Sequence, residues 1–169
     1  VNLAEMDKIE MLGNIRGLAA AENLTDAVHK DTLSSMAAIK NIQQYNGQEG
    51  CNRYIISQCN SALNAMEVYG LFQLGGWTKE ELKIDIVPLF ETIDDLQRSA
   101  GIMKTLYSDP VYREHLHRRS NRQTIMLGFS DGTKDGGYLM ANWSIYKAKE
   151  ELTSISREHG IDVVFFDGR

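Results

Sequence analysis

Residues 124–137 read TIMLGFSDGTKDGG. An apolar run of strand type is followed there by a glycine-rich turn, and a helical pattern extends from about residue 137 to a stop at Gly160. Three other short apolar runs have the same character and cover residues 54–57, 84–90 and 161–166. A helical pattern follows each of the first three runs in the chain, so the sequence predicts strands and helices in alternation.

The four predicted strands are continuously apolar and do not alternate, which is typical of parallel strands buried on both faces. A closed (β/α)8 barrel needs eight strand–helix units and about 250 residues. We therefore expect an α/β fold, a partial (β/α)8 barrel with about four parallel strands and many helices. A small, open, doubly wound sheet is the alternative that the length leaves open.

The first fifty residues have a different pattern. Apolar residues recur at three-residue steps over residues 3–15 and again over 33–42, which predicts two packing helices. We expect the second helix to begin at an N-cap in Asp31-Thr32 and to end at Asn46-Gly47. The sequence thus divides into a helical segment, residues 1–50, and half of a (β/α)8-type barrel, residues 51–169.

The composition is that of an ordinary globular protein, with 43% hydrophobic and 24% charged residues among 169. A net charge of −5 argues against nucleic acid or an anionic membrane surface as a partner. We find neither an apolar run long enough to span a bilayer nor a secretory signal at the N-terminus. Cys51 and Cys59 lack metal-site spacing and fit a reducing compartment, so we expect a cytoplasmic protein.

The histidines and the helix aromatics predict structural roles. His115 and His117 lie two residues apart in a basic run, and on a helix they would not share a face. We therefore expect a solvated helix face there and no zinc site. Leu139, Trp143 and Tyr146 form one stripe of the last predicted helix, and we interpret this stripe as facing the core.

Carboxylates follow the predicted strands at the point where functional residues of parallel sheets cluster. Glu91 comes directly after the second strand, and Asp131 comes just after the third. Because adjacent parallel strands lie about 4.8 Å apart, these two side chains could share one hard cation such as magnesium. The alternative is that each acid only caps the helix that follows it.

Two basic residues lie at the same predicted edge. Lys134 is in a glycine-rich turn before a helix, where backbone N–H groups and an ammonium can bind phosphate. The alternative is a tight turn with a solvated lysine. Arg169 could grip a phosphate or a carboxylate with two hydrogen bonds, or it could be frayed as a terminal residue.

Two longer segments resemble phosphoenolpyruvate carboxylase: VPLFETIDDL at residues 87–96 and MLGFSDGTKDGG at residues 126–137. YIIS at residues 54–57 and FDGR at residues 166–169 support them. The segments occur in the order typical of that family, and the resemblance covers roughly residues 31–169.

The resemblance implies a (β/α)8 enzyme that converts phosphoenolpyruvate and bicarbonate to oxaloacetate and phosphate with Mg²⁺ or Mn²⁺. It implies that Glu91 and Asp131 are metal carboxylates, that Lys134 is an active-site lysine, and that Arg169 handles the anionic substrates. Asp167 departs from the family, which usually has a histidine there, so we carry no function over to it.

Other parts of the family pattern are missing from the chain, including a second histidine motif and the glycine-rich continuation beyond Arg169. We therefore expect a piece of the catalytic barrel that is inactive by itself and self-associates through unpaired sheet edges, from a parent enzyme that is a homo-oligomer. Two alternatives stay open: a non-catalytic structural or assembly module, and a small α/β phosphate-binding protein.

Overall fold

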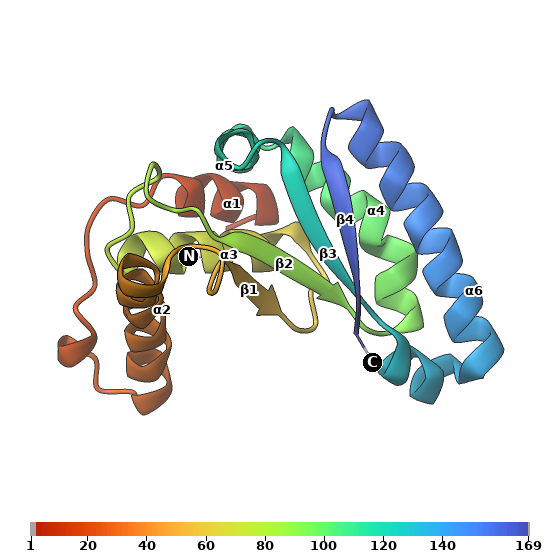
Figure 1. Ribbon diagram of the computed structural model, residues 1–169, viewed down its shortest axis with the longest axis horizontal. Helices are drawn as coiled ribbons and strands as arrows, with labels where there is room; N and C mark the ends of the chain where they lie inside the picture. The colour runs from red at the N-terminus through yellow and green to blue at the C-terminus, as the bar shows by residue number, and fades with distance from the viewer. Residues whose placement is uncertain (1–2, 169) are drawn as a thin grey trace.

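The four predicted strands form one parallel sheet. The computed structural model describes residues 3–168 and contains β1 (Arg53–Ile56), β2 (Asp85–Phe90), β3 (Arg122–Gly128) and β4 (Asp162–Gly168). All three strand pairs are parallel, and the order across the sheet is β1-β2-β3-β4 (Figure 1). The α/β class and the four parallel strands are thus confirmed.

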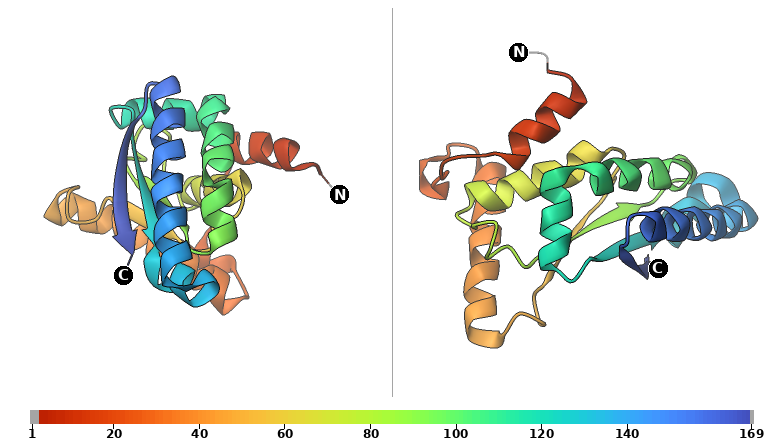
Figure 2. Two further views of the ribbon diagram at one scale, coloured as in Figure 1. Left: turned by 90° about the vertical axis from the view of Figure 1, so that its right-hand side faces the viewer. Right: turned by 90° about the horizontal axis from the view of Figure 1, so that it is seen from above.

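The strand order distinguishes a partial barrel from a doubly wound sheet. A doubly wound sheet reverses its strand order at a switch point and carries helices on both faces. Here each strand is added beside the previous one, and crossovers of the same hand in the same direction place their helices on the same face. Figure 2 shows α4 (Ile93–Ser108) and α6 (Phe129–Glu158) together on one side of β3 and β4. The fold is a partial barrel.

Three of the helices begin where an N-cap side chain accepts hydrogen bonds from the free amides of the first turn. Asp26 caps α2 (Ala27–Asn46), Thr92 caps α4, and Asp109 caps α5 (Pro110–Arg118). No helix within residues 3–168 is both long and apolar enough to cross a membrane. The helical elements are α1 (Glu5–Gly13), η1 (Ala21–Asn23), α2 (Ala27–Asn46), α3 (Ala62–Leu74), α4 (Ile93–Ser108), α5 (Pro110–Arg118) and α6 (Phe129–Glu158).

One predicted helix start was wrong, and one predicted turn proved to be helical. Helix α2 begins after Asp26, whose carboxylate accepts hydrogen bonds from the amides of Val28 and His29. The expected N-cap at Asp31-Thr32 therefore lies inside the helix. The predicted glycine-rich turn is itself helical from Phe129, and a kink at Gly137, with φ of +80°, separates this short segment from the rest of α6. Glycine tolerates this positive φ, so the chain can turn there between the two helical segments.

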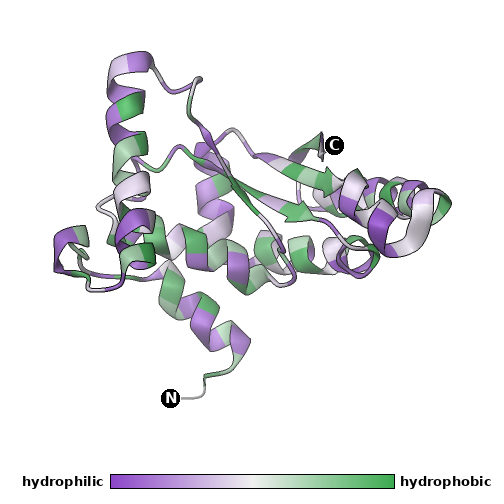
Figure 3. Cartoon of the chain, turned by 90° about the horizontal axis from the view of Figure 1, so that it is seen from below, coloured by the Kyte–Doolittle hydropathy of each residue, from purple (hydrophilic) through white to green (hydrophobic). Residues whose placement is uncertain are grey.

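The core lies between one face of the sheet and the helices. Side chains of alternate residues in the two central strands are fully buried against the helix layer, namely Ile86, Phe90, Ile125 and Leu127. Ile9, Leu33 and Met36 of the N-terminal helices belong to the same hydrophobic cluster. Figure 3 shows these hydrophobic stretches in green along the strands. On the other face Ile55 and Phe166 are 45% and 51% exposed.

Two surface predictions were wrong as well. His115 is buried, although the basic run around it suggested a solvated helix face. Leu139, Trp143 and Tyr146 are 81%, 59% and 58% exposed, so their stripe faces away from the core. Helix α6 packs against α4 and β4 through a second stripe of mostly small residues, including the buried Ala141, Ala148 and Leu152. Small side chains let the two helices approach closely, and this contact decided which stripe is buried.

Candidate functional site

The candidate site lies at the carboxyl ends of β2 and β3. Glu91 follows β2 directly, and Asp131 lies in the first turn of α6 after β3. The register pairs Phe90 with Leu127, so the next residues, Glu91 and Gly128, are neighbours across the sheet. The two carboxylates therefore come from segments that leave the sheet side by side, as the strand-end argument predicted.

Glycines make this approach possible. A methyl group on Gly128 would lie 3.0 Å from the Glu91 Cα, and one on Gly132 would lie 3.4 Å from the Glu91 carbonyl oxygen. A side chain at Gly128 would press on the backbone of the neighbouring segment. The β3–α6 connection is thus built to lie directly against the residue that carries the first carboxylate.

Lys134 and Asp131 form an ion pair. The Lys134 Nζ donates to the Asp131 Oδ1 at 2.8 Å, and the two side chains are 73% and 53% exposed. They lie three residues apart on the short helical segment before Gly137, so they share a face of it. An exposed pair of this kind contributes at most about 1 kcal/mol, so other ligands can compete for either partner.

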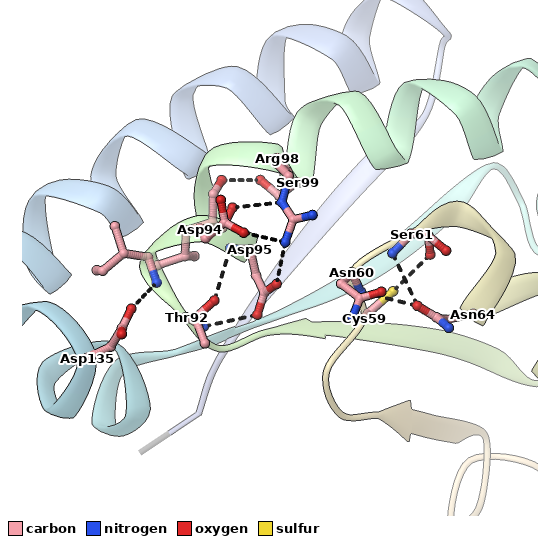
Figure 4. Close-up of polar contacts among 12 residues, drawn as sticks. Cys59, Asn60, Ser61, Asn64, Thr92, Asp94, Asp95, Arg98, Ser99 and Asp135 are labelled. Atoms are coloured by element: carbon pink, nitrogen blue, oxygen red, sulfur yellow. Dashed lines mark hydrogen bonds and ion pairs between the residues drawn. The ribbon is translucent and has the colours of Figure 1, made fainter.

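The start of α4 adds residues that the sequence analysis missed (Figure 4). Thr92 and Asp95 form a reciprocal capping box, a pattern that the TIDD sequence could have revealed. Asp135 reaches across from the segment of Asp131 and Lys134, and its Oδ2 accepts the Ile93 amide at 3.0 Å. These two residues are 42 positions apart in sequence, so no local pattern could have paired them.

Asp167, at the end of β4, is among the residues that the structure describes. Asp167 lies in register with the buried Leu127, and its Oδ1 accepts a hydrogen bond from Lys149 of α6 at 2.9 Å. Its side chain therefore turns toward the helix layer. Arg169 lies outside the described residues. A hollow of about 440 Å³ beside this strand end is lined by Phe129, Tyr138, Asn142, Ile145, Lys149 and Asp167.

The chemistry available here is that of oxygen ligands and cations. Within residues 3–168, no group of three or more His, Cys, Asp or Glu side chains could hold a metal ion. Magnesium often takes only one or two protein carboxylates and completes its shell with water and substrate oxygens.

Burial raises the pKa of the Cys59 thiol to about 12, so this cysteine is no nucleophile. Burial, with Arg119 nearby, lowers the pKa of His115 to about 3.

The comparisons with known proteins extend the resemblance beyond its motifs. The family model described as phosphoenolpyruvate carboxylase matches residues 2–169. The match therefore includes the N-terminal helices, which lie before the region of roughly residues 31–169 that the motifs suggested.

Named relatives agree with the family model. A phosphoenolpyruvate carboxylase of Corynebacterium diphtheriae is 38% identical over 99% of this chain and 19% of its own length. The enzymes of Nitrosomonas eutropha and Mycobacterium leprae are 42% and 37% identical over 76% and 94% of this chain, or 14% and 18% of their own lengths. The chain thus spans less than a fifth of the relatives that it matches. It belongs to the phosphoenolpyruvate carboxylase family.

Proposed function

We propose that this chain supplies the strand-end carboxylates and cations of a phosphoenolpyruvate carboxylase active centre. Glu91 and Asp131 would hold Mg²⁺ or Mn²⁺, while Lys134 and Arg169 would bind the anionic substrates. The observation that carries the proposal is the contact of Gly128 and Gly132 with the Glu91 backbone, which brings the two carboxylate-bearing segments together.

The donor set fits a hard divalent cation. Two carboxylates from adjacent strand ends offer oxygen ligands, and the exposure of Asp131 leaves room for water and substrate oxygens. The Asp131 carboxylate would have to leave the Lys134 ammonium to bind a cation. The release of Lys134 would in turn free its positive charge for the substrate, so the two events are coupled.

The proposed reaction transfers the phosphoryl group of phosphoenolpyruvate to bicarbonate, which gives carboxyphosphate and the enolate of pyruvate. The carboxyphosphate then splits into carbon dioxide and phosphate, and the enolate attacks this carbon dioxide to give oxaloacetate. A bound divalent cation would supply positive charge for the phosphoryl and enolate oxygens. Lys134 would share in this task by holding its ammonium near the phosphoryl oxygens. The chain spans at most 19% of the relatives named above, so we propose that it does not turn over alone.

Calorimetric titration with Mn²⁺ tests the proposal. We expect Glu91→Gln and Asp131→Asn to weaken binding at least ten-fold, because each removes one charged ligand and keeps the shape of the side chain. Lys134→Met should tighten binding several-fold, because it removes the ammonium that competes for Asp131. Asp162→Asn is the matched control, since this exposed carboxylate lies at the opposite end of the sheet.

Two outcomes would contradict the proposal. Absence of Mn²⁺ binding by the unmodified chain would favour the assembly-module alternative, in which the chain serves as scaffold only. Equal weakening by Asp162→Asn would mean that binding follows overall charge and not the strand-end site. Oxaloacetate formation by the purified chain, measured with phosphoenolpyruvate, bicarbonate and Mn²⁺, would refute the expectation that the chain is inactive alone.

A further inference from the structure

The hydrogen bond from Ile93 to Asp135 joins the two halves of the proposed site. We propose that Asp135 is a positioning residue that fastens the segment carrying Asp131 and Lys134 to the start of α4, beside Glu91. This inference rests on the proposed function, because it concerns the arrangement of the same carboxylates.

The Ile93 amide is the first of α4 and needs an acceptor from outside the helix. Thr92 already provides acceptors for Asp95 and Leu96, through its hydroxyl and its carbonyl oxygen. The Asp135 Oδ2, 3.0 Å from the Ile93 nitrogen, accepts a hydrogen bond from this first amide and brings a charge that suits a helix N-terminus. Figure 4 shows the Asp135 side chain pointing from its own segment to this amide.

Gly136 lets the two segments touch at the same place. A methyl group on Gly136 would lie 2.8 Å from the Ile93 Cγ1, closer than van der Waals contact allows. Immediately afterwards, Gly137 turns the chain away with a φ of +80°. The end of the short helical segment is therefore held against α4 by one hydrogen bond and one close contact.

The short helical segment is thus attached at both ends. Its start lies against the Glu91 backbone through Gly128 and Gly132, and its end is fastened to Ile93 through Asp135. Asp131 and Lys134 lie between the two attachments. With the second attachment removed, the segment could pivot about the first, and the Asp131 carboxylate would lose its fixed relation to Glu91.

Amide hydrogen exchange and Mn²⁺ titration of Asp135→Ala and Asp135→Asn test this role. Loss of a capping acceptor typically corresponds to about a five-fold change in equilibrium constant. We expect Asp135→Ala to raise exchange at Ile93 and over residues 129–137 about five-fold and to weaken Mn²⁺ binding by a similar factor. Asp135→Asn keeps an acceptor oxygen and should restore both values to within about two-fold.

Asp94→Ala is the matched control. It removes a carboxylate from the first turn of the same helix, but Asp94 pairs with Arg98 inside α4 and does not reach the segment of Asp131. We expect exchange over residues 129–137 to be unchanged in this variant. A rise equal to that of Asp135→Ala would show that the loss of charge alone loosens the segment, and it would overturn the proposal.

Two other results would also overturn it. If Asp135→Asn weakened Mn²⁺ binding as strongly as Asp135→Ala without raising exchange, Asp135 would act through its charge, as a ligand, and not as an attachment. If Asp135→Ala left exchange unchanged, the hydrogen bond would not hold the segment. If the unmodified chain bound no Mn²⁺, the proposed function would fail by itself, and exchange alone would decide whether the attachment exists.

Discussion

We expect the buried His115 to lower the unfolding free energy of the chain in mild acid. Its imidazole is 1% exposed and lies between the rings of Tyr69 and Tyr112, with centroid distances of 5.5 and 5.8 Å. Within residues 3–168 neither ring nitrogen meets the geometry of a hydrogen bond, and the Ile84 backbone near the ring offsets only part of the cost of burial. Burial is the largest cause that lowers its pKa from 6.5 to about 3, and the charge of Arg119 adds to it.

The sign and size of the effect follow from linkage. The folded chain binds this proton only near pH 3, whereas the unfolded chain binds it below pH 6.5. The stability that neutral His115 contributes is therefore complete above pH 6.5 and is lost as the pH falls. At pH 5 the unfolded imidazole is about 1.5 pH units below its pKa, which corresponds to about 2 kcal/mol of lost unfolding free energy.

Urea denaturation at pH 7 and pH 5, followed by circular dichroism, measures this loss. Leucine and glutamine have volumes similar to that of histidine and do not titrate. Between pH 7 and pH 5, the unfolding free energy of His115→Leu and of His115→Gln should therefore fall by about 2 kcal/mol less than that of the unmodified chain. Every other titrating group is common to the three proteins and cancels in the comparison. An equal loss in all three would refute the assignment of a buried, neutral histidine.

Three further predictions follow from the packing of the sheet. Gly128→Ala should lower the unfolding free energy by about 1–3 kcal/mol in urea denaturation, because its methyl group would press on the Glu91 Cα at 3.0 Å; unchanged stability would contradict this close approach. Asp167→His, which restores the usual family residue, should lower the unfolding free energy by at most about 1 kcal/mol, because the ion pair with Lys149 that it removes is partly exposed. A double-mutant cycle with Lys149→Met measures the energy of this pair, and a coupling energy above about 2 kcal/mol would contradict the prediction. The unmodified chain should have a light-scattering mass above 19.1 kDa, and Phe166→Lys should shift it toward the monomer, because Phe166 is 51% exposed on the open face of the sheet; a clean monomer before the substitution would refute self-association.

Local sequence patterns were enough to predict the strands and the residues at their ends. Continuous apolar runs placed the four strands to within about two residues. The expectation that these strands are buried on both faces was wrong for the outer strands, where Ile55 and Phe166 are 45% and 51% exposed. The alternation of strands and helices predicted a parallel sheet, and the position of Glu91 and Asp131 just after strands predicted that they would lie at one edge. The motifs around them also indicated the family.

Helix faces and buried polar residues were harder to predict. The stripe of Trp143 and the stripe of Ala141 both have helical spacing, and the more hydrophobic one proved to be exposed. His115 looked solvated because its sequence neighbours are basic, yet it packs between two tyrosine rings. In both cases the outcome depends on which element packs against the helix, and that partner is distant in sequence.

Residue types at short spacing were enough to indicate the parallel α/β class, the strand-end carboxylates and the family. Packing of the whole chain was needed to show that the strands follow one another across a partial barrel and that Asp135 holds the start of α4. Strand order and the contact between Asp135 and Ile93 join segments tens of residues apart, and such contacts exist only once the chain has packed.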